Sequence, residues 1–488
     1  MSSRVLRTLA SVGVILVLLI SSCAAVNNVD PTPTPDDVMV DPTPTPDDVD
    51  VDPTPTPDDV DVDPTPTPDD VDVDPTPTPD DVDPDDEDLT GQVVNILGVW
   101  AGSELEAFQA MVQPWEERTG AQMTYEATRD VNAVLRTRVD GGNPPDMVGL
   151  PGPGQVGIYA EEDQLVDLGQ FIDMDYLEEN YAQNWIDLST YEDTLHAVFI
   201  KADLKSFVWY SPPAFEEAGY EIPETWDEMI ALSDQIVADG GTPWCIGIES
   251  GAASGWPGTD WIEDIMLRTA GPEVYDQWYQ HEIAWTSDAV RNAWETWGEI
   301  VHEPNYVDGG TTGVLATNFG ESVYGILEEP PRCYMHRQAT FIEGFLTDQF
   351  PDAEAQVDYD FFLFPPIDPE HNSPMLVAGS QMAAFNDTPA VRSLINWLIT
   401  AEAQAIWAER GAYIAPNTGV DPDVYPDEVN RQAAQLLAEV EEVRFDASDM
   451  MPSAVNQAFW TGIINYVENP DQLDQILQNI EDVAQETY

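Results

Sequence analysis

A proline- and aspartate-rich repeat divides this chain into a segment that cannot form a core and a segment that can. Five copies of an 11-residue unit begin at positions 30, 41, 52, 63 and 74, and each reads DPTPTPDDV followed by two residues. The prolines fix φ and remove backbone donors, while the aspartates repel one another. We therefore expect residues 23–92 to form a disordered, polyproline II-like linker, because they bury too little apolar surface to fold.

The first 23 residues carry a targeting pattern. Two arginines precede an apolar run over residues 9–20 that is too short to span a bilayer comfortably, and small residues follow it before Cys23. This resembles a bacterial lipoprotein signal, in which residues 1–22 are removed and the cysteine is acylated. An ordinary secretory signal and a single anchor helix are the alternatives. All three place the chain outside the cytoplasm, and the first anchors it to the cell membrane by lipid at Cys23.

Residues 89–488 form one continuous globular sequence with an extreme acidic charge. The full chain has a formal net charge of −76. Without the 23 acids of residues 30–88 and the two N-terminal arginines, 69 acids face 14 bases, a net charge of −55. Nucleic acid and anionic membrane surfaces are also negatively charged and would be repelled by this segment, so we expect neither as a partner. The 400 residues exceed what one hydrophobic core supports, which predicts two lobes.

Two cysteines remain in the globular segment once Cys23 is assigned to lipid. Cys245 and Cys333 have largely apolar neighbours, and an even pair in an oxidising compartment favours a disulfide over a catalytic thiol, although the sequence leaves both open. The five histidines are scattered and form no cluster with cysteine at metal-ligand spacing. The phosphate-binding pattern GxxxxGK[ST] does not occur. We therefore expect neither a metal nor a cofactor.

Apolar runs of strand length alternate with amphipathic helical patterns through the globular segment. Strands are expected at 93–99, 123–127, 147–150, 196–200, 207–210 and 245–248, and helices at 103–118, 131–139, 213–218, 227–238, 261–269, 290–300, 390–407 and 429–440. This alternation predicts an α/β protein with parallel sheets.

Ligands of such sheets bind beyond the carboxyl ends of the strands. That rule marks the loops at 100–104, 150–155 and 249–261, which contain aromatic, small and polar residues suited to a sugar ring. A tryptophan is more often a core residue than a ligand contact, but the glycine- and serine-rich setting of Trp256 favours contact. Lys201 and Lys205 are the only lysines of the chain. The sequence leaves open whether they are ion-pair partners or ligand contacts.

Six stretches of the globular segment carry a resemblance to a known family. They are GNPPDM at 142–147, KSFVWY at 205–210, TWDE at 225–228, TPWCIGIESGAASGWPGTDWIED at 242–264, PRCYMHRQATFI at 331–342 and FDASDMMP at 445–452. Together they resemble the extracytoplasmic solute-binding proteins of carbohydrate ABC importers, the group that includes the maltose-binding proteins. The longer stretches are similar to the alpha-glucoside-binding branch, and the resemblance covers essentially all of residues 93–488.

The resemblance implies a two-lobed periplasmic-binding-protein fold of the type II-like class. Lobe I would comprise 93–200 and 376–418, and lobe II would comprise 203–372 and 420–488. Several crossovers would join the lobes, which close around a sugar. Both cysteines of the globular segment then fall in lobe II, which supports a disulfide, and both lysines fall at the first crossover.

The resemblance also implies the sugar contacts. Lobe I would supply Trp100, Ser103, Glu104, Pro151 and Gln155, and lobe II would supply Asp203 or Lys205, Ser254, Trp256, Asp260, Gln338 and Asp449. The loop at 151–154 departs from the maltose-binding relatives, which carry aromatic and charged residues where this chain reads PGPG. A flatter, less charged wall favours a different sugar length.

The function implied by the resemblance is non-covalent capture of an oligosaccharide, with an alpha-glucoside disaccharide as the expected ligand. A monomer would deliver it to ABC permease subunits in the membrane, without acting as an enzyme. A surface glycoside hydrolase is one alternative, because the many acids make a catalytic carboxylate pair available. A sugar-sensing partner of a membrane receptor is another, and it would bind the same ligands.

Overall fold

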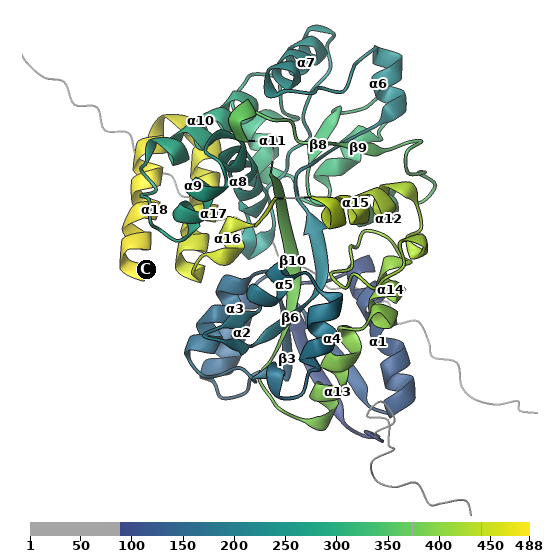
Figure 1. The fold of residues 1–488 in the computed structure, drawn as a ribbon. Coiled ribbons are helices and arrows are strands. Elements are labelled where there is room, and N and C mark those ends of the chain that lie inside the picture. Colours follow the sequence, from purple (N-terminus) through teal and green to yellow (C-terminus); the bar gives the residue numbers. More distant parts are fainter. Residues whose placement is uncertain (1–87, 372–373, 441) are drawn as a thin grey trace, which may run out of the picture. The chain divides into compact units, whose positions relative to one another are not determined.

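The structure is a computed structural model that describes residues 88–371, 374–440 and 442–488. Its elements are shown in Figure 1. The expected signal peptide at 1–22, the lipidation site Cys23 and the repeats lie outside the described residues. Those expectations therefore stay predictions.

A six-stranded mixed sheet organises the first part of the fold. Its strands are β1 (Val93–Gly98), β2 (Gln122–Ala127), β3 (Met147–Leu150), β6 (Ala197–Leu204), β10 (Met375–Ala384) and β11 (Val443–Phe445). Strand β1 pairs in parallel with β2 and β3, and β10 pairs in parallel with β11 but antiparallel with β3 and β6. The expected strands at 93–99, 123–127 and 147–150 are confirmed. The predicted parallel pairing is correct for β1 with β2 and β3 and for β10 with β11, but not for β10 with β3 and β6.

Helices cover both faces of this sheet (Figure 1). On one face lie α1 (Ser103–Thr119), α13 (Pro389–Leu398) and α14 (Ala401–Ala408), and on the other lie α2 (Val131–Asp140) and α3 (Pro153–Glu161). A hydrophobic core lies on each face of the sheet, and alternate residues of β1 point into the two cores. Ile96 packs with the first set of helices and Leu97 packs with the second. Two short helices, α4 (Met174–Asn180) and α5 (Gln183–Asp187), and the hairpin of β4 (Thr190–Tyr191) and β5 (Thr194–Leu195) lead from α3 to β6.

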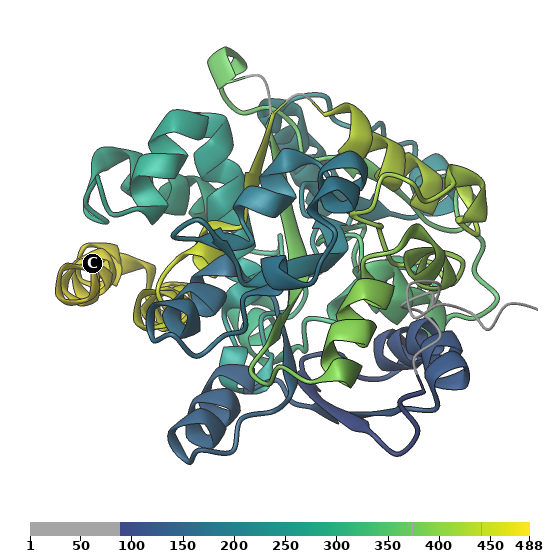
Figure 2. The ribbon, with the colours of Figure 1, turned by 60° about the horizontal axis from the view of Figure 1, so that its bottom comes forward.

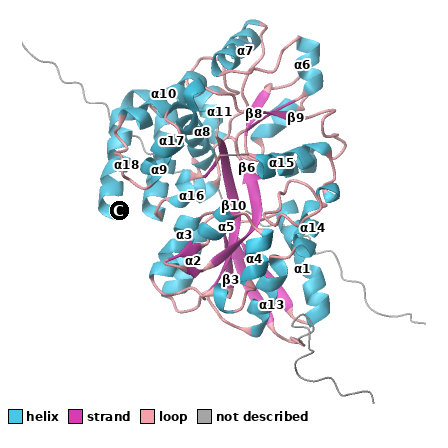
Figure 3. Cartoon of the chain, viewed as in Figure 1, coloured by secondary structure: helices cyan, strands magenta, loops and turns pink. Residues whose placement is uncertain are grey.

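The long strands β6 and β10 run side by side through the centre of the fold (Figure 3). Residues 375–377 of β10 pair with β11, whereas residues 381–384 pair with β3, and a register shift lies between them at Ser380 and Gln381. Gly379 of β10 lies close to β6, where a Cβ would lie 2.7 Å from the carbonyl oxygen of Lys201. This strand pair therefore connects the two regions that we expect to form the lobes. The predicted lobe boundaries remain predictions.

A second sheet has three antiparallel strands. They are β7 (Phe207–Tyr210) at the centre, with β8 (Met335–Arg337) and β9 (Asp360–Leu363) on its sides. The prediction of parallel sheets is wrong here. Both β8 and β9 run antiparallel to β7, although the segments that connect the three strands contain helices.

The remaining α-helices complete the fold, and most of them pack in the core around this second sheet. They are α6 (Pro212–Ala218), α7 (Trp226–Ala238), α8 (Trp256–Thr269), α9 (Pro272–Tyr279), α10 (Asp288–Val301), α11 (Gly310–Ala316), α12 (Ile342–Gln349), α15 (Glu428–Glu439), α16 (Ala447–Met450), α17 (Ser453–Glu468) and α18 (Leu473–Thr487). The last two pack along each other at the C-terminal end of the chain (Figures 1 and 2). Within the described ranges, no helix has the length and apolar composition needed to cross a membrane.

Three expected elements differ in the structure. Residues 245–248 form no strand, because their amides bond to separated segments: Cys245 donates to Met335 and Ile248 donates to Val314. Helix α8 begins at Trp256 rather than at residue 261, since Gly255, with φ 110°, ends the preceding loop. The helix expected at 390–407 is two helices, because Thr400 caps a new one by accepting a hydrogen bond from the amide of Ala403.

The two cysteines of the globular segment form a disulfide, as the sequence favoured. Cys245 and Cys333 are bonded, with their Cα atoms 5.4 Å apart and both side chains buried. Gly325 packs against the bridge, where a Cβ would lie 2.5 Å from Sγ of Cys333 and 2.7 Å from Sγ of Cys245. A side chain at position 325 would therefore displace the bridge.

Candidate functional site

A cleft of about 1140 Å³, part of it open to solvent, lies where loops from both predicted lobes meet. The loops after β1, β2 and β3 line one side of it. The start of α8 and the segment around α16 and α17 line the other side, and β6 and β10 contribute residues between the two. The rule that ligands bind beyond the carboxyl ends of strands thus locates one side of the cleft correctly.

Eight of the twelve predicted contact residues line this cleft. They are Trp100, Glu104, Pro151, Gln155, Asp203, Lys205, Trp256 and Asp449. Ser103 lines a neighbouring cavity of about 760 Å³, which shares Glu104 and Phe341 with the cleft. The other three, Ser254, Asp260 and Gln338, do not line the cleft. Contact of any of these residues with a solute stays a prediction.

The three residues that do not line the cleft have roles within the protein. Asp260 is fully buried behind Lys205 and bonds to its ammonium group. The side-chain oxygen of Gln338 accepts a hydrogen bond from the amide of Ala339. Ser254 closes its own turn, because its hydroxyl accepts from the amide of Ser250 and donates to Gly251. The family resemblance could not reveal that these side chains already bond to groups within the protein.

Trp256 is the tryptophan that the sequence singled out, and it is a partly exposed lining residue of the cleft. It lies at the start of α8, with its ring centroid 5.2 Å from that of Phe319 and 6.0 Å from that of Phe341. Trp100 differs, because it is only 2% exposed and packs in the core against Phe108 and Trp407. Of these two tryptophans, Trp256 is therefore the one that offers an aromatic surface to a solute.

Several lining residues were missed by the sequence analysis. Arg129 lies in the loop after β2, which was not among the loops marked from the sequence. The rule that ligands bind beyond the carboxyl ends of strands applies to this loop as well. The guanidinium of Arg129 lies 5.1 Å from the ring centroid of Phe319, which lies on the other side of the cleft. Trp460 follows the recognised stretch at 445–452 by eight residues, on α17. Phe341 lies within the recognised stretch at 331–342, whereas Phe319 carries no local pattern that would have indicated it.

Two polar atoms at the cleft have no hydrogen-bond partner among the described residues. They are Oε1 of Gln155, from α3, and Nε1 of Trp460, from α17. Buried polar groups in proteins are almost always hydrogen-bonded, and leaving one unpaired costs about 1–3 kcal/mol. One is an acceptor and the other a donor, so together they suit a solute that carries hydroxyl groups.

The charged residues between the two sides are largely engaged with one another. Nζ of Lys201 lies 2.9 Å from Oε1 of Glu104 and 3.5 Å from Oδ2 of Asp203. Asp203 also accepts a hydrogen bond from the hydroxyl of Thr340. Lys201 is 2% exposed, so this ion pair ties β6 to the start of α1 inside the protein. The structure thus favours an ion-pair role for Lys201.

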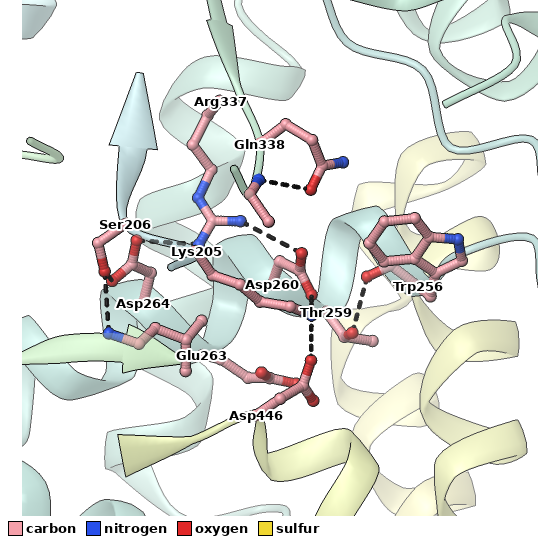
Figure 4. Close-up of polar contacts among 12 residues, drawn as sticks. Lys205, Ser206, Trp256, Thr259, Asp260, Glu263, Asp264, Arg337, Gln338 and Asp446 are labelled. Atoms are coloured by element: carbon pink, nitrogen blue, oxygen red, sulfur yellow. Dashed lines mark hydrogen bonds and ion pairs between the residues drawn. The ribbon is translucent and has the colours of Figure 1, made fainter. Parts of the chain in front are cut away.

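Lys205 lies at the centre of a buried acidic cluster (Figure 4). Its ammonium group bonds to Oδ1 of Asp260 at 2.8 Å and to Oδ2 of Asp446. Glu263 accepts a hydrogen bond from the amide of Ser448, and Asp449 follows on α16. Burial raises the pKa of Asp260 to about 6, against the opposing effect of Lys205.

The pKa values of this cluster show how its charge is balanced. Burial, together with the charge of Asp446, raises the pKa of Glu263 and that of Asp449 well above their usual ranges. The charge of Lys205 overcomes burial and lowers the pKa of Asp446. Glu263 and Asp449 therefore bind protons more readily than carboxyl groups in water do, which lessens the negative charge gathered around Lys205.

Comparison with known proteins places this fold in a family. A family profile described as bacterial extracellular solute-binding protein matches residues 101–405. The chain belongs to this family. The osmoprotective compounds-binding protein GgtB of Synechocystis sp. is 43% identical over 397 residues, which cover 81% of this chain and 93% of that protein. The alpha-glucosides-binding periplasmic protein AglE of Rhizobium meliloti is 39% identical over 398 residues, covering 79% and 86%.

Solved structures share the fold of this solute-binding protein at lower identity. The bacterial solute receptor AcbH has a TM-score of 0.71 at 18% identity and covers 81% of this chain and 99% of its own. A chitin oligosaccharide binding protein has a TM-score of 0.70 at 18% identity, covering 81% and 98%. These likenesses confirm the expected two-lobed α/β solute-binding fold.

The acidic cluster of the solute-binding protein also contains the one grouping of potential metal ligands found among the described residues. Carboxylate oxygens of Asp260, Glu263 and Asp446 lie within 4.8 Å of one another. The ammonium group of Lys205 already bridges two of the three, and Ca²⁺ requires six to eight oxygen ligands. The carboxylates of the cluster are therefore better suited to binding the ammonium group of Lys205 and protons than to binding a metal ion.

A buried glutamate beside the cleft makes the stability of the protein depend on pH. Glu343 on α12 is 4% exposed and accepts a hydrogen bond from the hydroxyl of Tyr359 at 2.8 Å, and burial raises its pKa to about 7. The folded state therefore binds the proton more tightly than the unfolded state. The contribution of Glu343 to the free energy of unfolding therefore falls as pH rises from about 4.5 to about 7, and it is constant above pH 7.

Glu343→Gln cannot ionise and retains an oxygen that accepts from Tyr359. We expect it to raise the free energy of unfolding at pH 8 by about 3 kcal/mol, since the pKa of Glu343 rises from 4.5 to about 7 and one pKa unit corresponds to about 1.4 kcal/mol. The gain should disappear near pH 4.5. Urea unfolding at both pH values measures it, with the exposed Glu178→Gln as the control. Equal effects of the two substitutions at pH 8 would refute the assignment.

Proposed function

We propose that this solute-binding protein captures an alpha-glucoside outside the cytoplasm and delivers it to the membrane permease of an ABC importer. The observation that carries the proposal is the composition of the cleft. A partly exposed tryptophan, Trp256, lines the same cleft as Oε1 of Gln155, an acceptor, and Nε1 of Trp460, a donor, which have no hydrogen-bond partner within the part of the chain that the structure describes. Aromatic faces cover the C–H faces of a sugar ring, and planar polar groups bond its hydroxyls.

The charges at the cleft support a neutral solute. Lys201 and Lys205 are buried and already paired with carboxylates. A charged solute that bonded to either lysine would have to replace these pairs, which leaves buried charges uncompensated and costs several kcal/mol. The name of the relative that binds alpha-glucosides, 39% identical to this chain, supports the choice of sugar.

The proposed mechanism is closure of two lobes around the sugar. A ligand shifts this equilibrium only through contacts that it makes better in the closed form, so it must touch both sides of the cleft at once. Trp256 and Trp460 would contact it from lobe II, and Gln155 would contact it from lobe I. Acylation at Cys23 would hold the monomer near the permease and raise its effective concentration there.

A panel of sugars tests this function. Maltose, trehalose, sucrose, longer maltodextrins and xylo-oligosaccharides are added to the protein while its thermal unfolding is followed. A bound alpha-glucoside at 100 times its Kd adds about 2.7 kcal/mol to the free energy of unfolding and raises the melting temperature. The sugar is then recovered and analysed by chromatography.

Intact sugar together with a raised melting temperature is the expected result. Released glucose would indicate a glycoside hydrolase instead. A shift with peptides and none with any sugar would overturn the proposed class of solute.

A further inference from the structure

Two glycines at the start of α3 lie in backbone contact with α16. A Cβ on Gly152 would lie 2.3 Å from the carbonyl oxygen of Asp449, and a Cβ on Gly154 would lie 2.6 Å from that of Met451. Neither glycine has a positive φ, so the backbone conformation itself would accept alanine. Only the closeness of α16 excludes a methyl group at these two positions. We refer to this as the α3–α16 contact.

The α3–α16 contact joins two separate parts of the protein. Helix α3 directly follows β3, and its residues Val156 and Tyr159 pack in the core on one face of the six-stranded sheet. Helix α16 follows β11, and Ala447 and Met451 pack in the core that surrounds the second sheet. Strand β10 pairs with β11 before its register shift and with β3 after it. A bend of β10 at the shift would therefore separate α3 from α16.

The α3–α16 contact has the properties expected of two surfaces that separate and associate reversibly. Within the described ranges, no hydrogen bond or ion pair connects residues 151–161 to residues 446–452. Separation therefore leaves no unpaired polar group behind and costs only van der Waals contact. A permanent interface between two cores would normally be fixed by interdigitated side chains, whereas here a loop and a helix of four residues meet through their backbones.

We propose that Gly152 and Gly154 are positioning residues for solute capture, because they allow the backbone contact that α3 and α16 make only when the lobes close. The inference rests on the proposed function. Asp449 and Gln155 lie on opposite partners of the contact, and both line the cleft. The contact thus sets the distance between the two sides that grip the solute. A methyl group at position 154 would hold the sides apart and weaken their simultaneous contact with the sugar.

Helix α3 offers a matched control. Gly157 lies in the same helix, and the nearest atom to a Cβ on it is Cδ2 of Tyr191, at 4.0 Å. Gly154→Ala and Gly157→Ala therefore each add one methyl group to the same helix, but only the first obstructs α16. Both variants are made in the full mature chain. Melting temperatures are measured without ligand, and affinities for maltose, trehalose and sucrose are measured by calorimetry.

The expected result has two parts. Without ligand, Gly154→Ala melts at the same temperature as Gly157→Ala, because the open form does not make the contact. With sugar, Gly154→Ala binds at least 10-fold more weakly than Gly157→Ala, whose affinity equals that of the wild type. Small-angle scattering shows the wild type contracting when sugar is added and Gly154→Ala contracting less.

Two results would overturn the proposal. A ligand-free Gly154→Ala that melts several degrees below Gly157→Ala would show that the contact is a permanent part of the fold. Equal sugar affinities of the two variants would show that the contact does not position the cleft. If none of the three sugars binds the wild type, the proposed function fails, and the ligand-free melting comparison still decides whether the contact is permanent.

Discussion

Replacing Lys205 with methionine lowers the free energy of unfolding by about 3–5 kcal/mol, the range measured when one partner of a buried ion pair is removed. The ammonium group bonds to Asp260 and Asp446, all three side chains are buried, and Lys205 lowers the pKa of Asp446. Methionine keeps most of the volume but leaves the two carboxylates facing each other. The loss should be greater at pH 8 than at pH 5, because protons relieve the repulsion at the lower pH.

Urea unfolding of Lys205→Met at pH 5 and pH 8 measures this effect. Arg431→Met is the control, since Arg431 forms an exposed pair with Glu428 on α15. An exposed pair of this kind contributes at most about 1 kcal/mol. If the two substitutions cost the same, the buried cluster does not depend on its lysine, and the account of its charge balance is wrong.

Replacing Trp256 with alanine is expected to weaken sugar binding by about 2–3 kcal/mol, or roughly 30- to 150-fold, as for large aromatic anchors of binding sites. The ring lies beside Phe319 and Phe341, and the ammonium group of Lys205 is 5.4 Å from its centroid. The indole face is therefore fixed before the sugar arrives, so that little side-chain entropy is lost on binding.

Calorimetric titration of Trp256→Ala and Trp256→Phe distinguishes the aromatic face from mere bulk. Phenylalanine keeps a ring at the same place, so it should restore much of the affinity. Melting temperatures of the ligand-free variants show whether the fold is intact. An unchanged affinity of a folded Trp256→Ala would mean that the sugar binds elsewhere.

Local sequence patterns were sufficient for the elements that build the first side of the cleft. The apolar strand at 93–99 and the amphipathic helix after it are β1 and α1, and the loop between them lines the cleft. Strand β3 was placed at its observed bounds, and its following loop also lines the cleft. These predictions succeed because periodicity and strand-end position depend on neighbouring residues only.

Contacts between distant segments were not predictable in this way. Lys205 bonds to Asp260 and Asp446, which are 55 and 241 residues away. The family resemblance implied that Asp260 contacts the sugar, whereas in the structure it balances the charge of a lysine. The glycines at 152 and 154 suggested a flat wall, yet they also allow another helix to approach. Such roles are set by packing, which local patterns do not encode.

The central claim is that residues from both sides of one cleft hold a sugar without changing its bonds. A diffraction structure of the protein crystallised with the sugar that most raises its melting temperature tests this claim directly. The account predicts one intact sugar in the cleft, against Trp256 and Trp460 on one side and Gln155 on the other. A sugar bound outside this cleft, or one that touches only a single side, would contradict it.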